Sequence, residues 1–400
     1  MSGERRAEVL VVGGGPAGAM TAALLARRGR DVLVLEKARF PREKPCAEYL
    51  SPGVVAILQR AGVLDAVRAA GAAWPAGMHV DNGRASFLVA YHSPGGVEAR
   101  TALGIPRPVF DQLLLDYARR CGARVWERWR VLAATVERGR VVGVRARASD
   151  GEVELRAELV VGADGIHSAV ARSLGLDLPV RWPQRLGLVA RYAGVRGIER
   201  FGAMHVGHGL YCGLAPVGFG LVNVGLVGAL QTRRPGESMV RYFERRLAEL
   251  PGAAEALRGA RRVTPLRGVG PLARRVRRVA GPGYLLVGDA AGFLDPFTGE
   301  GVYRALRGAE LAACAIERAL QRCDRLPIGY ERARQAAFAD KERVCLLVQL
   351  FLGSPWGFDY VVRRLSARPH VARLLAGVLG DYRPARSALR PSYLWALLKP

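Results

Sequence analysis

One segment near the start of the chain restricts the possible folds more than any other. An apolar run at 8–12 predicts a buried strand, 21–29 predict a helix, and 31–36 predict a second strand that ends at Glu36. The first strand is followed by a Gly-x-Gly-x-x-Gly pattern formed by Gly13, Gly15 and Gly18. Such glycines allow backbone N–H groups and a helix N-terminus to approach a pyrophosphate, and the Glu36 carboxylate can accept hydrogen bonds from ribose hydroxyls. The segment therefore predicts a βαβ unit that binds an adenine dinucleotide.

Two more strands end in Gly/Asp loops, LVVGADG at 159–165 and LLVGDAAG at 285–292. These two loops are not expected in an ordinary NAD-binding domain. Other segments predict a helix around 54–70, a hairpin with turns at 81–83 and 94–96, and a helix and strand over 109–126. Short strands are predicted over 131–165, a separate antiparallel sheet over 180–230, a long helix over 301–320, and mainly helix from 327 onward. The chain thus reads as an α/β unit with sheet material inserted into it.

The three motifs together resemble those of a known family. GGGPAG, GADGIHSAV and GDAAGFLDPFTGEGV are similar to motifs of the FAD-dependent oxidoreductase superfamily, which includes the group A flavin monooxygenases and the geranylgeranyl reductases, and the resemblance spans 7–320. It implies a Rossmann-like FAD-binding domain interleaved with an antiparallel β-sheet substrate domain, plus C-terminal helices. The expected boundaries are 1–75, 100–175 and 270–325 for the FAD-binding domain, 76–99 and 176–269 for the substrate domain, and 326–400 for the helical region.

The resemblance also implies FAD contacts. Asp289 matches the acidic residue that binds the ribityl chain, Asp164 and Gly165 match a motif for pyrophosphate and nicotinamide contacts, and Arg107 matches an arginine that touches the flavin. A helix N-terminus at 296–301 would stabilise negative charge around N1 and O2 of reduced flavin. The candidate cofactor-binding residues are Gly13, Gly15, Pro16, Ala17, Gly18, Glu36, Lys37, Arg42, Cys46, Ala47, Arg107, Asp164, Gly165, Gly288, Asp289, Pro296, Thr298, Gly299, Glu300, Gly301 and Val302.

Three residues are candidate proton donors: Cys46, Glu48 and Tyr211. FPREKPCAEYLSPG at 40–53 resembles the reductase segment in which a Pro-Cys pair lies near the flavin, although Ala47 stands where the family usually has glycine. YCGLAPVGFGLVNVG at 211–225 resembles the reductases' substrate-sheet motif, but Gly213 and Ala215 replace the expected aromatic residues. A small buried hydrophobe for Cys46 and a plain β-sheet core for Tyr211 are the alternatives.

The reduced flavin has two plausible fates. Reaction with oxygen would hydroxylate or epoxidise an apolar aromatic, polyketide or lipid-like metabolite, and this NAD(P)H-dependent monooxygenase is the first hypothesis because such enzymes are numerous in the superfamily. Hydride transfer would instead saturate a C=C bond, as in geranylgeranyl reductases. The TGEG loop, and GDAAG where the hydroxylases usually have GDAAH, favour this reductase branch. A non-catalytic flavin-binding partner protein is a third hypothesis. Electrons would come from NADPH or NADH, with ferredoxin as an open alternative.

The charge and cysteine content bear on partners and location. The formal net charge is +25, 56 of the 60 basic residues are arginines, and the densest group comprises Arg261, Arg262, Arg267, Arg274, Arg275, Arg277 and Arg278. GC-rich codon usage explains such an excess of arginine. The functional alternative is that the positive charge docks the protein on an acidic carrier protein or a membrane surface. No nucleic-acid-binding motif accompanies the charge. Six scattered cysteines without metal-ligand spacing, and the lack of a signal sequence or a long apolar run, predict a cytoplasmic protein without a metal site. The broken apolar segment at 344–358 leaves peripheral membrane contact open.

Overall fold

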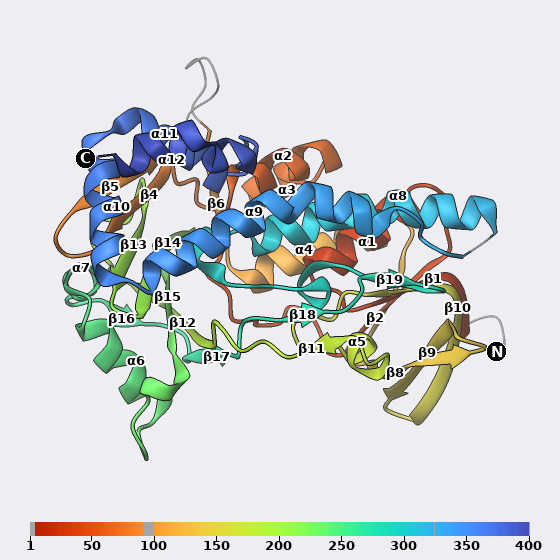
Figure 1. The fold of residues 1–400 in the computed structure, drawn as a ribbon. Helices are drawn as coiled ribbons and strands as arrows, with labels where there is room; N and C mark the ends of the chain where they lie inside the picture. The colour runs from red at the N-terminus through yellow and green to blue at the C-terminus, as the bar shows by residue number, and fades with distance from the viewer. Residues whose placement is uncertain (1–4, 92–99, 324, 400) are drawn as a thin grey trace.

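Two large β-sheets lie at opposite ends of an elongated molecule, and a layer of helices connects them (Figure 1). The structure is a computed structural model, and it describes residues 5–91, 100–323 and 325–399. Two short ribbons lie between the sheets: β3 (Tyr49–Leu50) pairs with β6 (Leu103–Gly104), and β11 (Asp177–Leu178) pairs with β18 (Arg275–Val276). The α/β fold with an inserted antiparallel sheet confirms the predicted fold class.

The first sheet contains the predicted βαβ unit at its centre. Five parallel strands run in the order β20-β10-β1-β2-β7, with Val11 of β1 opposite Val161 of β10 and Val34 of β2. The apolar residues of β1, β2, β20 and the second half of β10 are buried on both faces, as expected for a parallel sheet covered by helices, whereas those of the edge strand β7 are half-buried. The strands are β1 (Arg6–Val12), β2 (Val32–Glu36), β7 (Arg124–Glu127), β8 (Arg130–Glu137), β9 (Arg140–Ala148), β10 (Gly151–Gly162), β19 (Ala280–Gly281) and β20 (Tyr284–Leu286).

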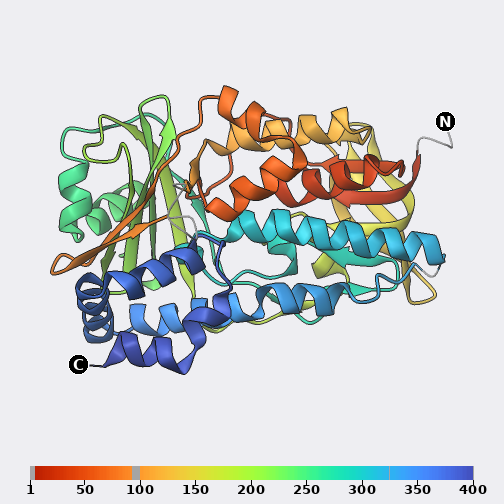
Figure 2. The same cartoon turned by 90° about the horizontal axis from the view of Figure 1, so that it is seen from above.

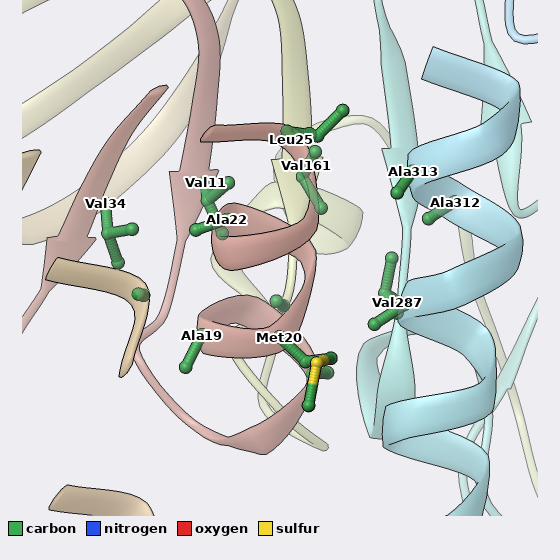
Figure 3. Close-up of a cluster of buried hydrophobic side chains, with 14 of the residues drawn as sticks. Val11, Ala19, Met20, Ala22, Leu25, Val34, Val161, Val287, Ala312 and Ala313 are labelled. Atoms are coloured by element: carbon green, nitrogen blue, oxygen red, sulfur yellow. The ribbon is translucent and has the colours of Figure 1, made fainter. Parts of the chain in front are cut away.

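Helices α1 (Pro16–Ala26) and α8 (Gly301–Arg322) lie side by side on this sheet, and Figure 3 shows part of the buried cluster to which both contribute. Ala22 and Leu25 of α1 lie in one buried cluster with Ala312 and Ala313 of α8, so alanines allow the two helices to approach closely. The predicted helix over 54–70 is wrong in one respect. It is two helices, α2 (Pro52–Ala61) and α3 (Leu64–Ala69), because Gly62 ends the first in the left-handed conformation with φ of 75°. Helices α4 (Arg107–Arg120) and α5 (Ala169–Ser173) complete this part.

The second sheet is almost entirely antiparallel, with strand order β16-β12-β15-β14-β13-β4-β5 and β17 paired to β12. One face packs on α6 (Met239–Ala248) and α7 (Pro251–Ala256) through Tyr242, Phe243 and Leu247. The predicted hairpin is β4–β5 with its turn at 82–85, whereas the 94–96 turn lies outside the described residues. The strands are β4 (Gly77–Asp81), β5 (Ser86–Ala90), β12 (Arg185–Ala193), β13 (Gly202–Gly207), β14 (Leu210–Gly218), β15 (Leu221–Ala229), β16 (Arg261–Arg262) and β17 (Arg267–Val269).

Four helices form the C-terminal part: α9 (Tyr330–Leu352), α10 (Pro355–Ala367), α11 (Pro369–Leu379) and α12 (Pro391–Leu398). Helix α9 runs from the first sheet to the second, and the other three gather beside β4 and β5 (Figures 1 and 2). Within the described residues no single helix has the length and apolarity of a membrane span. Helices α9 and α10 reach that threshold only together, and they are bent by 115° at their junction.

Candidate functional site

The loop between β1 and α1 is built for close backbone approach. Gly13 has φ of 101°, and a Cβ there would lie 2.6 Å from the Ala163 carbonyl oxygen. A Cβ at Gly18 would lie 1.9 Å from the Gly13 carbonyl oxygen, so only glycine fits. Gly15 is less restricted: its Cβ would meet only the Arg42 guanidinium, at 3.4 Å. The loop thus packs tightly against the strands while the N-terminus of α1 stays open to a cavity.

That cavity joins all three loop motifs. It has about 1300 Å³ of open space, including its mouth, and lies between the first sheet's loops and the second sheet. Helices α1 and α8 both begin at its wall, so two helix N-termini favour negative charge there. Its lining includes Gly15, Pro16, Ala17, Cys46, Ala47, Arg107, Gly165, Tyr211, Gly288, Asp289, Pro296, Gly299, Gly301 and Val302 among the predicted residues. We call it the central cavity.

Glu36 and Lys37 lie at the end of β2. Glu36 is buried, one carboxylate oxygen accepts a hydrogen bond from the Gly14 N–H at 2.8 Å, and the other accepts from the Ala38 N–H at 2.9 Å. The carboxylate is therefore fixed beside the glycine loop, where an adenosine ribose would lie in a Rossmann unit. Lys37 is exposed, and its charge helps to lower the pKa of His167.

The second and third motif loops meet at the cavity. Asp164 caps α5 by accepting hydrogen bonds from the Ala169 and Val170 N–H groups, and its other oxygen is buried without a partner among the described residues. Gly165 and Gly288 have φ of 80° and 63°. Asp289 lines the cavity, and its carboxylate lies 3.6 Å from the Lys44 ammonium. Lys44 was not singled out from sequence.

The loop from Pro296 to Val302 turns its backbone towards the cavity. Thr298 instead faces a neighbouring chamber and donates a hydrogen bond to the Cys345 sulfur at 4.0 Å. Glu300 points away from the cavity: it is fully buried, 3.5 Å from Arg304 and 4.0 Å from Lys341, and burial raises its pKa. Its side chain therefore supports the loop from behind, while Pro296, Gly299, Gly301 and Val302 line the cavity.

Lys341 of α9 ties this loop to the C-terminal helices. Its ammonium donates hydrogen bonds to the Val378 carbonyl at 2.6 Å and to Asp381 at 2.7 Å, and Asp381 also accepts from the Ser51 hydroxyl at 2.6 Å. Lys341 and the side chain of Asp381 are both buried. One buried cation thus connects the segment before α2, the loop after α11 and the start of α8.

The segment at 40–48 forms one wall of the cavity. Cys46 and Ala47 line it, and the Asn223 side chain holds this wall by donating a hydrogen bond to the Cys46 carbonyl at 2.9 Å. Arg107 binds Asp111 through two hydrogen bonds of 2.7 Å and also contacts the Cys46 thiol. Arg42 pairs with the same Asp111 at 3.1 Å, so this buried carboxylate orients two arginines.

Glu48 does not line the central cavity. Its carboxylate accepts two hydrogen bonds from the Arg191 guanidinium and one from the Arg107 backbone N–H at 2.8 Å. Arg191 also binds Glu43. Since every oxygen of Glu48 is engaged and its side chain is 2% exposed, the structure places it as a support for the wall and not at the wall itself.

Tyr211, on β14, lines the cavity from the opposite side. Its hydroxyl donates a hydrogen bond of 2.6 Å to Asp295, which also caps the Pro296 turn by accepting from the Phe297 N–H. Arg185 lies over the Tyr211 ring and 3.6 Å from the other Asp295 oxygen. Burial raises the pKa of Tyr211 well above its usual value and also raises the pKa of Asp295. Asp295 lies inside the quoted GDAAGFLDPFTGEGV motif but was not singled out from sequence.

An apolar chamber with about 700 Å³ of open space, including its mouth, adjoins the cavity, where β4, β5, β13 and β14 face the loop at 296–299. The two spaces share Ala47, Tyr49, Met204, Gly213, Pro296 and Gly299. Gly213 and Ala215 leave room in it, while aromatic walls come from Tyr49, Tyr91 and Phe297, which sequence reasoning missed because they belong to other segments. The part of the chain that the structure describes holds no group of three or more His, Cys, Asp or Glu residues arranged for a metal ion.

The arginines at 261–278 lie on several elements and the loops between them. Arg261, Arg262 and Arg267 lie on β16 and β17 at the edge of the second sheet. Arg274 and Arg275 line a second cavity, with about 710 Å³ of open space including its mouth, together with His167 and Arg172, and Arg274 binds the Ile166 carbonyl and Asp177. This basic cavity touches the central cavity at Ile166.

Comparison with known proteins agrees with this geometry. The FAD binding domain family matches residues 6–340. A menaquinone reductase of Mycolicibacterium smegmatis is 34% identical over 324 residues, covering 77% of this chain and 76% of the relative. The digeranylgeranylglycerophospholipid reductase 2 of Methanopyrus kandleri is also 34% identical over 324 residues, with 78% of each chain covered.

Solved structures show the same fold. A geranylgeranyl bacteriochlorophyll reductase-like protein of Thermoplasma acidophilum superposes with a TM-score of 0.81 over 96% of this chain and 99% of its own, at 24% identity. The myxobacterial chondrochloren halogenase superposes with a TM-score of 0.79 over 86% of this chain and 82% of its own, at 26% identity. The glycine-shaped loops, the two helix N-termini and these matches show that the chain belongs to the FAD binding domain family and is a FAD-dependent oxidoreductase.

Proposed function

We propose that the protein is a FAD-dependent reductase that saturates a carbon–carbon double bond in a lipid with an isoprenoid chain. The observation that carries the proposal is the apolar chamber, which opens directly from the cavity in which the flavin would bind. Relatives named for menaquinone and for digeranylgeranylglycerophospholipid support the same substrate class. Hydroxylation was the first hypothesis from sequence, and the proposal replaces it with the reductase alternative.

The chamber removes the main sequence argument against a prenyl substrate. Gly213 and Ala215 suggested that pocket aromatics were lost. Tyr49, Tyr91 and Phe297 line the chamber instead, together with Met78, Val80, Val89 and Leu379. Small residues on β14 therefore widen the passage, and side chains from other elements supply its apolar and aromatic walls.

When bound, FAD supplies the hydride. The loop glycines and the N-terminus of α1 would hold its pyrophosphate, Glu36 its ribose, and the backbone of 296–302 its ring. Saturating a double bond also requires a proton, and two groups on the cavity wall can give one: the Cys46 thiol and the Tyr211 hydroxyl. The raised pKa of Tyr211 keeps its hydroxyl protonated but makes it a weak acid, and its O–H is donated to Asp295, so this hydrogen bond must break before Tyr211 can give its proton to a substrate.

NADPH or NADH would reduce the flavin, and the basic cavity beside Ile166 suits their phosphates. His167, Arg172, Arg274 and Arg275 line it. Burial lowers the pKa of Arg274, and burial with nearby cations lowers that of His167, so an anion would relieve an excess of positive charge. Replacing both Arg172 and Arg275 with Gln should slow flavin reduction by NADPH and leave reduction by dithionite unchanged.

The test is anaerobic incubation of the FAD-loaded protein with NADPH and either menaquinone or a digeranylgeranyl lipid. The expected product gains two hydrogens. Gly213→Phe should block the passage to the chamber and abolish lipid reduction while NADPH still reduces the flavin; Gly213→Ala is the matched control, because its Cβ would meet nothing nearer than 3.5 Å. A product that gains one oxygen, and only in air, would overturn the proposal in favour of a monooxygenase.

A further inference from the structure

Large apolar side chains are exposed on the C-terminal helices. Trp356 is 82% exposed, Trp395 65% and Leu350 61%, which is unusual for residues of this size. Leu346 and Leu350 lie one turn apart near the end of α9, and α10 begins directly after the break that follows. The Tyr360 hydroxyl of α10 donates a hydrogen bond of 2.6 Å to the Leu398 carbonyl of α12. The exposed large apolar residues of these connected elements are Leu346, Leu350, Trp356, Tyr360, Trp395 and Leu398, and we call this set of residues the apolar face.

Positive charge accompanies the apolar face. The Lys399 ammonium lies 4.4 Å from the centre of the Trp395 ring, and the Arg364 guanidinium lies 5.7 Å from that of Tyr360. Residues 344–400 contain eight Arg and Lys residues but only two acidic residues. Both acidic residues are engaged: Asp359 binds Arg363 at 2.8 Å, and Asp381 is the buried partner of Lys341. This part of the chain therefore combines exposed apolar side chains with an excess of positive charge.

This combination fits an anionic lipid surface. Tryptophan prefers the boundary between headgroups and acyl chains, and Lys and Arg next to it are attracted to anionic headgroups. A second copy of the same chain is a poor occupant, because each copy carries a net charge of +25. The 115° bend between α9 and α10 also suits helices that lie in a membrane surface better than a rod that crosses it.

Helix α9, which carries Leu346 and Leu350 of the apolar face, also packs behind the apolar chamber together with α11. Leu352 of α9 and Ala376 of α11 belong to the buried cluster that contains Val80, Val89 and Tyr91, and Leu379 lines the chamber itself. A membrane at the apolar face would thus lie next to the space assigned to an isoprenoid lipid. This link rests on the proposed function, whereas the exposed face and its charge do not.

We propose that the apolar face docks the protein on a bilayer containing anionic phospholipid, with Trp356 and Trp395 inserted at the headgroup level. Vesicle flotation without substrate tests this. The FAD-loaded wild type should float with vesicles of equal parts phosphatidylcholine and phosphatidylglycerol, and high salt or phosphatidylcholine alone should weaken binding.

Trp356→Ser/Trp395→Ser should reduce binding at least about tenfold. Trp182→Ser is the matched control, because Trp182 is half exposed but lies in the loop between β11 and β12. Equal flotation of the double variant and the wild type, or no flotation of the wild type, would overturn the proposal. A wild-type dimer that the double variant splits would also overturn it, in favour of self-association.

Activity separates this proposal from the reductase function. The double variant should reduce detergent-dissolved lipid as fast as the wild type and lose turnover only when the lipid is in vesicles. Wild-type flotation without any lipid reduction would refute the reductase function and leave the docking face intact. Equal loss of turnover in detergent and in vesicles would overturn the docking face as the route of substrate access.

Discussion

The contact between Arg191 and Glu48 allows a sharp test of how the cavity wall is supported. Arg191→Met removes the guanidinium and keeps much of the aliphatic stem. Glu48, whose side chain is 2% exposed, then becomes a buried carboxylate that keeps only the Arg107 backbone N–H as a donor. Breaking a buried ion pair from one side costs about 3–5 kcal/mol. Glu43 adds little, because its side chain is 30% exposed and solvent can replace the lost contact.

This cost can be converted into a thermal shift. At the average unfolding entropy per residue, 1 kcal/mol shifts the midpoint of a chain of 400 residues by about 1.2 °C, so Arg191→Met should melt about 4–6 °C below the wild type. Scanning calorimetry of the FAD-loaded protein measures the shift. Arg191→Met/Glu48→Gln should be more stable than Arg191→Met alone, because the second change removes the orphaned charge.

Two results would refute the reasoning. One is a melting temperature of Arg191→Met within about 1 °C of the wild type. The other concerns Glu48→Gln alone. If this variant kept its stability and its FAD but lost lipid reduction while NADPH still reduced the flavin, Glu48 would be the proton donor and not a positioning residue.

Four further predictions follow from the site. Gly18→Ala should purify without FAD, because its Cβ would lie 1.9 Å from the Gly13 carbonyl oxygen. Gly187→Ala is the control and should keep FAD, because its Cβ would have no neighbour nearer than 3.6 Å. The flavin absorbance of the purified proteins measures the bound FAD. Tyr211→Phe should lose about 1–3 kcal/mol of stability and slow flavin reoxidation by lipid but not reduction by NADPH in stopped flow. If Cys46→Ser slowed reoxidation by lipid and Tyr211→Phe did not, the thiol would be the donor. Burial raises the pKa of Asp295, so the folded state keeps a proton that the unfolded chain releases near pH 3.9. The free energy of unfolding of the wild type, relative to that of Asp295→Asn, should therefore fall as pH rises from about 4. A difference between the two proteins that does not change with pH in denaturant titrations would contradict this. Lys341→Met should lower the free energy of unfolding by about 3–5 kcal/mol in denaturant titrations, because it leaves the buried Asp381 without its cation. A decrease of less than about 1 kcal/mol would contradict a stabilising buried pair.

The features that could be predicted from sequence are those encoded over short distances. Gly13, Gly15 and Gly18 follow directly after a strand, and their positions alone constrain the backbone. The same holds for the loops around Gly165 and Gly288. These local signals predicted the first sheet and its dinucleotide loop, and the resemblance they carry to a flavoenzyme family is confirmed.

The features that could not be predicted depend on distant partners. Nothing near Glu48 indicates that Arg191, 143 residues later, would occupy its carboxylate. Likewise, Gly213 and Ala215 suggested a pocket without aromatics, because Tyr49, Tyr91 and Phe297 reach the chamber from other elements. The helix predicted around 54–70 divided because Gly62 can end a helix as well as continue it, and only packing decides between the two.

The buried ammonium of Lys341 has a consequence for protein engineering. It joins the Val378 carbonyl and Asp381, with Glu300 4.0 Å away, and so couples residues from both ends of the sequence. A chimera that exchanges the C-terminal helices between relatives would separate these charges unless Ser51, Glu300, Lys341 and Asp381 are exchanged as one set. Truncation before α9 would leave Glu300 without that cation behind the loop that faces the cavity. The C-terminal helices are therefore not an exchangeable module: a recombination boundary in the loops of the second sheet keeps Glu300, Lys341 and Asp381 together, and only Ser51 must then be matched in the other parent.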